Sequence, residues 1–378
     1  MTSKLTFQVQ NPQSWPLWLK THILVSGVKT IKLLDPDVIG GDPLPGVRTI
    51  GRLYFNNSSD LPLIRRGAAG AREYVNWCLP RIDKAPWVYA WEGPNEPEVS
   101  DLESCRWLNE FEYERVQLLH ARGRRTASYS LGTSHPAGPQ NDPLPMIRAK
   151  WRALQPAAAI TDYLSLHEYG MRTLDPTALN EWHVGHYKRG VEVLRSMGRV
   201  PPVLITEFGI DYSGSQTEDG WRVALLGDEQ TYMRQLAARD AEYSADPLVH
   251  GVYIFVWHDH NWPSFTMIES MSWRMTQYVR AQGAFDPAVT PAPGGGGGGG
   301  TGIDAGLLAE AEAQVIPMVP GHALWDYITG RGWVLASREW TSSDGMTYQW
   351  GYDAPRRRRV LCRWSALGGV EECYVRAN

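Results

Sequence analysis

Two glutamates stand at the ends of apolar runs that are typical of buried strands. Glu96 follows the run WVYAWEG (87–93), and Glu207 lies near the end of the run PVLITEFG (202–209). If both runs are strands of one parallel barrel, their ends open at the same mouth and the two carboxyl groups face each other. One carboxyl of such a pair can protonate a leaving oxygen while the other attacks an anomeric carbon or activates water. Cleavage of a glycosidic bond is the chemistry that this pair suits.

Two further acids flank Glu96, and we expect smaller parts for them. Glu92 lies four residues earlier, on the strand or just past it, and we expect it to help set the proton affinity of Glu96. Glu98 is expected to be a solvated residue at the start of the next loop. The segment is therefore interpreted as one acid, one tuning residue and one bystander.

The N-terminal part of the chain has the pattern of repeated βα units. Short β-branched and apolar runs alternate with longer amphipathic runs, for example at 67–82, 101–123 and 228–246, which indicates a parallel sheet with helices. Eight units in this length predict an α/β fold, the (β/α)₈ TIM barrel. An open doubly wound sheet is the alternative, but no glycine-rich phosphate-binding turn follows the first strand. The eight predicted strands are 5–10, 28–35, 47–55, 87–93, 125–132, 162–170, 202–209 and 249–257.

A proline-rich and then glycine-rich stretch, TPAPGGGGGGGTG (290–302), divides the chain. Consecutive glycines have no preferred backbone conformation, so the stretch predicts a flexible linker. We therefore predict a catalytic barrel over 1–287, a linker over 288–302 and a small accessory α+β domain over 303–378. In the last part, helical patterns at 306–317 and 322–332 precede β-like runs, and its tryptophans suit either a small core or stacking on a polysaccharide.

Cys362 and Cys373 lie in the last two predicted strands, on either side of the turn ALGG. A two-residue loop at Leu367 and Gly368 places the cysteines opposite each other and permits a disulfide between the strands. A loop one residue later shifts the register and separates them. The sequence leaves both registers open.

Other predicted strands also end in polar or aromatic residues. Asn95 directly precedes Glu96, His167 and Tyr169 end the sixth strand, and Trp257 ends the eighth. Catalytic groups of a barrel come from the carboxyl ends of its strands, so we expect these side chains to bind the substrate.

Three more candidates rest on their position in the chain. Arg52 lies in the third predicted strand, Asp35 ends the second, and His135 follows the fifth. We expect all three to line the same mouth of the barrel.

The strand-end motifs resemble those of the large clan of retaining (β/α)₈ glycosidases that includes cellulases, mannanases and xylanases. Asn95-Glu96-Pro97 looks like the Asn-Glu pair that ends strand four in this clan, and Glu207 in ITEFG looks like its strand-seven nucleophile. The resemblance implies that Glu96 is the general acid and base and that Asn95 binds the sugar 2-hydroxyl.

Two more motifs add to the resemblance. His167-x-Tyr169 is similar to the His-x-Tyr of strand six in several of these families, where the tyrosine hydrogen-bonds the nucleophile, and Trp257 resembles the strand-eight tryptophan under the sugar. Arg52 is compared with an arginine that holds the nucleophile in parts of the clan. The likeness covers residues 1–285 as architecture and does not extend to the tail.

The resemblance implies a retaining, endo-acting hydrolase of β-glycosidic bonds in a polysaccharide or oligosaccharide. Retaining enzymes hold the two carboxyls about 5 Å apart, which leaves no room for a water between them. Two negative charges at this distance disfavour each other's ionisation, so we expect Glu96 to hold the proton. A catalytically silent barrel that binds a glycan or cell envelope, as in a phage or surface assembly, and an inverting glycosidase are the alternatives.

Composition limits the other partners. A net charge of −4 provides no general attraction to nucleic acid or to an anionic membrane. No apolar run reaches the roughly 20 residues that cross a bilayer, and the first residues lack the apolar core of a secretory signal. We therefore expect a protein that is cytoplasmic as sequenced, or released by non-classical export or lysis. The mechanism needs no cofactor, no metal site is predicted, and a monomer is compatible with the sequence.

Overall fold

The computed structural model contains a closed barrel of eight parallel strands. It describes residues 2–136, 142–175, 183–211 and 220–286, together with five strands between residues 334 and 377. Each barrel strand pairs with the next one along the chain, and β8 closes the barrel by pairing with β1. Every strand overlaps one of the eight predicted runs, which confirms the barrel. The strands are β1 (Leu5–Val9), β2 (Thr30–Leu34), β3 (Arg48–Arg52), β4 (Ala90–Glu92), β5 (Arg125–Leu131), β6 (Tyr163–Gly170), β7 (Val203–Ile210) and β8 (Val249–Trp257).

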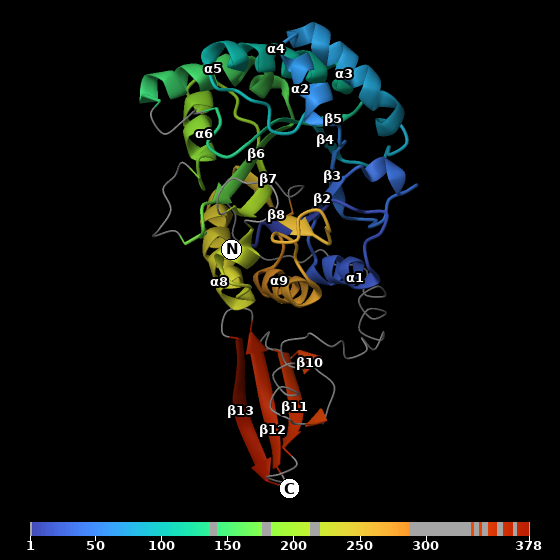
Figure 1. Cartoon of the computed structure of the whole chain (residues 1–378), viewed down its shortest axis with the longest axis vertical. Coiled ribbons are helices and arrows are strands. Elements are labelled where there is room, and N and C mark those ends of the chain that lie inside the picture. Colours follow the sequence, from blue (N-terminus) through green and yellow to red (C-terminus); the bar gives the residue numbers. More distant parts are fainter. Residues whose placement is uncertain are drawn as a thin grey trace, which may run out of the picture.

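Helices surround the strands (Figure 1), and α3, α4 and α5 lie side by side along one part of the wall. The helix α4 begins where the Asp101 side chain accepts a hydrogen bond from the Ser104 N–H, and α8 begins where Asp228 accepts one from Thr231. Such caps satisfy N–H groups that the first helical turn leaves unpaired. The helices are α1 (Leu17–Ser26), α2 (Asn57–Ile64), α3 (Gly67–Ile82), α4 (Leu102–His120), α5 (Leu144–Ile160), α6 (Tyr187–Arg195), α7 (Trp221–Ala224), α8 (Glu229–Ala245) and α9 (Glu269–Gln282).

The connection between β2 and β3 departs from the expected βα pattern. It contains a single 3-10 turn, η1 (Pro36–Val38), and no α-helix. The segment PDVIGGDPLPG (36–46) holds three prolines and three glycines, which interrupt helical hydrogen bonds or leave the backbone too free. The barrel therefore closes without a helix at this position.

Side chains fill the barrel in layers that differ in polarity. One layer is an apolar cluster contributed by six strands, Ile50, Ala90, Ala127, Tyr163, Leu204 and Tyr253. Two positions further along their strands come buried polar residues, including Glu92, Ser165 and Thr206. Because residues i and i+2 of a strand point to the same side, this polar layer lies next to the apolar one, toward the carboxyl ends of the strands. The catalytic candidates stand above the polar layer.

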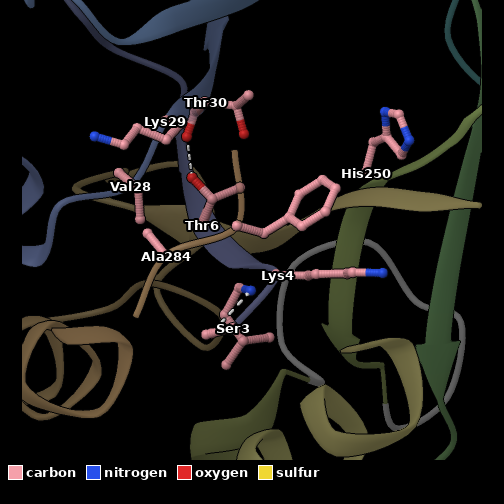
Figure 2. Close-up of a pocket in the computed structure, with 10 residues that line it drawn as sticks. Ser3, Lys4, Thr6, Val28, Lys29, Thr30, His250 and Ala284 are labelled. Carbon is pink, nitrogen blue, oxygen red and sulfur yellow. Dashed lines mark hydrogen bonds between the residues drawn. The ribbon is translucent and has the colours of Figure 1, made fainter. Parts of the chain in front are cut away.

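A small hollow lies at the opposite end of the barrel, among the first residues of β1, β2 and β8 (Figure 2). The Thr6 hydroxyl donates to the Thr30 carbonyl at its edge, and the Lys4 ammonium lies 4.9 Å from the centre of the Phe285 ring. Burial lowers the pKa of Lys4 to about 8 and that of His250 to about 4. In barrels of this kind, residues at the amino ends of the strands serve stability, so we assign this hollow no part in catalysis.

Five antiparallel strands form a separate sheet in the C-terminal part, with the order β10-β11-β12-β13 and with β9 paired to β11. They overlap the predicted β-like runs, whereas the linker and both predicted helices lie outside the described residues. The division into domains therefore stays a prediction. The strands are β9 (Val334–Leu335), β10 (Trp340–Thr341), β11 (Thr347–Asp353), β12 (Arg358–Ser365) and β13 (Gly369–Ala377).

The register of β12 and β13 differs from the one that would face the two cysteines. Ser365 pairs with Gly369, and Cys362 pairs with Glu372 instead of Cys373. A register shift next to Leu361, which pairs with Tyr374, leaves Cys373 without a directly opposite residue. The structure therefore adopts neither of the two registers that the sequence left open.

Over the described residues, no helix is both long enough and apolar enough to cross a lipid bilayer.

Candidate active site

Glu96 stands just beyond β4 with its carboxyl group partly exposed. Its backbone is left-handed (φ 43°), and its N–H donates to the carbonyl of Ser130 in β5 across 3.1 Å. Left-handed backbone is uncommon for a residue with a side chain and gathers at functional sites. The side chain is 42% exposed, so it is the more accessible of the two candidate carboxyls.

Glu207 lies in β7, and its carboxylate is held on both oxygens. Oε1 accepts from Arg52 Nη1 at 2.8 Å and from Lys32 Nζ at 3.2 Å, while Oε2 accepts from the Tyr169 hydroxyl at 2.8 Å. Arg52 also donates to the side-chain oxygen of Asn95, so one guanidinium joins the strand-four and strand-seven residues. Only 7% of the Glu207 side chain is exposed. The surrounding donors fix one orientation of this carboxylate.

His167, on β6, lies between the two carboxyl groups. Its Nδ1 is 2.8 Å from Glu96 Oε1 and 3.7 Å from Glu207 Oε2, and its side chain has no exposed surface. One oxygen of each glutamate and one ring nitrogen of His167 all lie within 4.8 Å of one another. The structure thus brings together Glu96, Glu207, Asn95, His167, Tyr169 and Arg52 from four strands and their ends.

Two residues of the site escaped the sequence analysis. Lys32, in the middle of β2, contacts Glu207, and Gln8 of β1 donates to the same Oε1 at 3.3 Å. Both side chains are fully buried. A lysine inside the apolar strand TIKLL and a glutamine inside LTFQV are the signals that could have indicated them, because a buried charge needs a partner.

Electrostatics at Glu207 favour the anion. Burial alone opposes its ionisation, but the charges of His167, Lys32 and Arg52, with the Tyr169 hydrogen bond, outweigh burial and hold the pKa of Glu207 well below its usual range. Burial and the nearby Glu207 charge raise the pKa of Tyr169 well above its usual value, so its hydroxyl stays a donor. Glu207 is therefore ionised, as a nucleophile must be.

The low pKa of Glu207 should make the stability of the fold depend on pH. The folded value lies below the 4.5 of an unperturbed glutamate, so the folded protein holds this proton less tightly than the unfolded chain. The corresponding stabilisation is complete above the unfolded pKa and is lost as the pH falls through the folded pKa. Between about pH 5 and pH 3, we expect the free energy of unfolding measured in urea to fall less for Glu207→Gln than for the parent. Glu98→Gln serves as the control, and equal pH slopes for Glu207→Gln and the parent would contradict the assignment.

Two predicted site residues lie apart from the carboxyl pair. Asp35 forms an ion pair with Arg81 of α3 at 2.8 Å and accepts from the Tyr54 N–H, so it anchors the loop after β2. His135 lies near the buried His186, and within the residues that the structure describes it makes no hydrogen bond or ion pair with either glutamate. No described hydrogen bond or ion pair joins Asp35 or His135 to Glu96 or Glu207, so their place at the catalytic mouth stays a prediction.

Trp257 is buried at the end of β8, where its ring packs 4.8 Å from that of Phe7 and no part of it is exposed. A sugar can reach this indole only after neighbouring side chains move, so its role under the sugar stays a prediction. Trp262 is partly exposed, and its ring centre lies 5.4 Å from that of Phe255. The ring centre of Phe255 lies 6.0 Å from that of Tyr169, so Phe255 connects the other two rings. Its place in the loop after β8 gave no periodic signal in the sequence.

The geometry of Glu96, His167 and Glu207 would also suit three ligands of a metal ion. However, Glu207 Oε1 already accepts hydrogen bonds from the cationic Arg52 and Lys32. Two positive charges beside this carboxylate repel a third cation, which makes this set a poor metal site. The arrangement suits proton transfer and nucleophilic attack better.

Comparisons with known proteins connect the chain with solved structures only. No protein-family model matches the sequence, and no curated protein matches it. Among solved structures, a GH128 (subgroup I) endo-β-1,3-glucanase from Amycolatopsis mediterranei in complex with laminaritriose is similar at a TM-score of 0.42 and 13% identity, covering 74% of this chain and 100% of that one. A GH128 (subgroup II) endo-β-1,3-glucanase from Sorangium cellulosum is similar at 0.41 and 15%, covering 75% and 98%. A β-glucuronidase from Ruminococcus gnavus is similar at 0.45 and 13%, covering 74% and 50%. These values are too low to assign a family or an activity.

Proposed function

We propose that this chain is a retaining glycoside hydrolase that cleaves β-glycosidic bonds by double displacement. The observation that carries the proposal is the pair of carboxyl groups at the ends of β4 and β7, with oxygens within 4.8 Å of each other. Retaining glycosidases hold their carboxyls about 5 Å apart, whereas inverting ones need about 6.5–9.5 Å for a water. An oxygen of each group within 4.8 Å of the other supports the retaining mechanism.

In the first step, Glu207 attacks the anomeric carbon while Glu96 protonates the departing glycosidic oxygen. The C–O bond to the leaving group breaks, its electron pair leaves with that oxygen, and a glycosyl ester forms on Glu207. In the second step, Glu96 removes a proton from water, the water oxygen attacks the same carbon, and Glu207 leaves as carboxylate. Two inversions at one carbon retain its configuration.

The surrounding residues support these roles. Arg52 and Tyr169 donate to separate oxygens of Glu207 and so hold the carboxylate for attack in one orientation. The 2.8 Å contact with His167 places the Glu96 carboxyl, which is the exposed one and can meet the leaving oxygen. Asn95, fixed by Arg52, is proposed to bind the sugar 2-hydroxyl.

Aromatic surfaces near the carboxyls are proposed to bind the sugar rings. Trp262 is partly exposed and packs against Phe255, which in turn packs against Tyr169, whereas the buried Trp257 needs its neighbours to move before it can meet a sugar. Flat apolar faces with polar edges suit sugar rings, which are apolar on one face. Endo action and the role of the C-terminal sheet as an accessory module belong to the same proposal.

A substrate panel tests the proposed function. We expect the full chain to release oligosaccharides from at least one of β-1,3-glucan, β-1,4-glucan, mannan, xylan and a chitin- or peptidoglycan-type polymer. Product sizes distinguish endo from exo action, and NMR of the first product anomer, followed before mutarotation, distinguishes retention from inversion. Inverted product would overturn the mechanism. Binding to a polymer without cleavage of any substrate would favour the catalytically silent barrel.

A further inference from the structure

Inside the barrel, a single buried lysine joins two carboxylates that belong to different strands. Lys32 Nζ lies 3.0 Å from Glu92 Oε2 and 3.2 Å from Glu207 Oε1, and it also donates to the Thr206 carbonyl at 3.1 Å. The side chains of Lys32 and Glu92 have no exposed surface. Water therefore does not screen these interactions, and each charge depends on its neighbours for compensation.

The action of Glu92 on Glu96 stays a prediction, and the described contacts of Glu92 lead to Lys32. Its Oε1 accepts from the hydroxyls of Ser165, at 2.7 Å, and Ser130, at 3.3 Å, and its Oε2 faces Lys32. The described residues place no hydrogen bond between Glu92 and Glu96. The carboxylate of Glu92 thus neutralises Lys32, and through it bears on the nucleophile candidate.

Ion pairs link four buried charged groups, two cations and two anions, and the charge of His167 acts on Glu207 beside them. Lys32 and Arg52 carry two positive charges, and Glu92 and Glu207 carry two negative ones. The other titratable groups that face Glu207 are His167 and Tyr169 from β6 and Glu96 from the end of β4. Arg52 and Lys32 together place two positive charges beside the single negative charge of Glu207. Glu92 neutralises part of the positive charge of Lys32.

We propose that Lys32 is a positioning residue, which shares its ammonium charge between Glu92 and Glu207 and thereby keeps the Glu207 carboxylate ionised and in place for attack. The role of Glu207 as nucleophile rests on the proposed function. The electrostatic link itself does not, because Glu207 can be titrated without any substrate.

The test separates the two contacts of Lys32 with two variants of the full chain. Lys32→Met removes the ammonium and strands Glu92 as a buried, uncompensated acid. Lys32→Met/Glu92→Gln removes both partners of the ion pair and leaves Arg52 to balance Glu207. Glutamate labelled with ¹³C at the carboxyl carbon then reports the titration of Glu207, whose signal is identified by its loss in Glu207→Gln. Urea unfolding at pH 7 is measured on the same samples.

We expect unfolding stability to fall in Lys32→Met and to recover in the double variant, because neutralising both partners of a buried pair removes the stranded charge. The pKa of Glu207 should behave differently and rise by at least about one unit in both variants, because a cation within bonding distance lowers a carboxyl pKa by about 1–3 units. A role of Lys32 as counter-ion of Glu92 alone predicts recovery of both quantities in the double variant.

Three results would overturn the proposal. One is a Glu207 titration in the folded double variant that equals that of the parent, and another is a Glu207 titration that stays unchanged in folded Lys32→Met. The third is failure of the double variant to fold, which would make Lys32 a packing residue. If the panel identifies a substrate, the acid limb of kcat/KM should move upward with the NMR pKa. A shifted NMR pKa in a chain that cleaves no substrate would leave the electrostatic link standing and count against the proposed function alone.

Discussion

Replacing Glu207 by Gln is expected to abolish glycoside hydrolysis, with a loss of kcat on the order of 10⁴–10⁶-fold, as when the covalent nucleophile of another hydrolase is removed. The amide keeps the size of the side chain and can still meet Tyr169, but it has no negative charge with which to attack carbon. It also leaves the cationic Arg52 and Lys32 without the negative charge that they share. The measurement is the initial rate on the substrate that the panel identifies, for parent and variant at equal concentration.

Glu98→Gln is the matched control, because Glu98 is an exposed glutamate two residues from Glu96. It should keep the parent rate. Circular dichroism and the urea midpoint at pH 7 confirm that Glu207→Gln remains folded. A folded Glu207→Gln variant that retains more than a tenth of the parent rate would show that this carboxylate is not the nucleophile.

Replacing Glu96 by Ala is expected to give the second-largest effect, and the effect should depend on the leaving group. General acid–base catalysis contributes about 10²–10⁴-fold, so a natural glycan, whose leaving oxygen needs a proton, should lose this much in kcat. The phenolate of an aryl glycoside with an acidic phenol can leave without that proton, so the rate of the first step should change little. Its second step should be slow, because no base activates the water.

Added azide distinguishes the role of Glu96 from that of Glu207. Azide needs no general base, so with Glu96→Ala it should attack the glycosyl ester from the vacated side and yield a glycosyl azide of retained configuration. With Glu207→Ala the only available product is an azide of inverted configuration, formed by direct displacement. The assignment of the two roles is falsified if these stereochemical outcomes are exchanged.

The fold was largely predictable because a (β/α)₈ barrel requires strands and helices to alternate, and the sequence shows this alternation in its apolar and amphipathic runs. The runs that became β1 to β8 are short, apolar and β-branched, and their helices are amphipathic, so burial preferences alone specify the order of elements. The exception lies between β2 and β3, where prolines and glycines leave only the turn η1. The sequence shows these prolines and glycines, but it does not show whether the barrel can close without a helix at this position.

The site was predictable at the strand ends and unpredictable between them. Glu96, Glu207 and Tyr169 meet as expected because all parallel strands of a barrel end at one mouth. For Asp35 and His135, which also follow strands, the structure shows other partners: Asp35 forms an ion pair with Arg81, and His135 lies near His186. Their part in the site stays a prediction.

By itself, the amino-acid sequence determined the eight strands, their order and the two carboxyl groups at the barrel mouth, since these follow from local periodicity and from a rule of the fold. Only the tertiary structure decided the charge of Glu207. Lys32 lies 64 residues before Glu96 and 175 before Glu207, yet its ammonium reaches the nucleophile candidate and the buried Glu92. Electrostatic interactions depend on separation in space and on exclusion of water, and a linear pattern records neither.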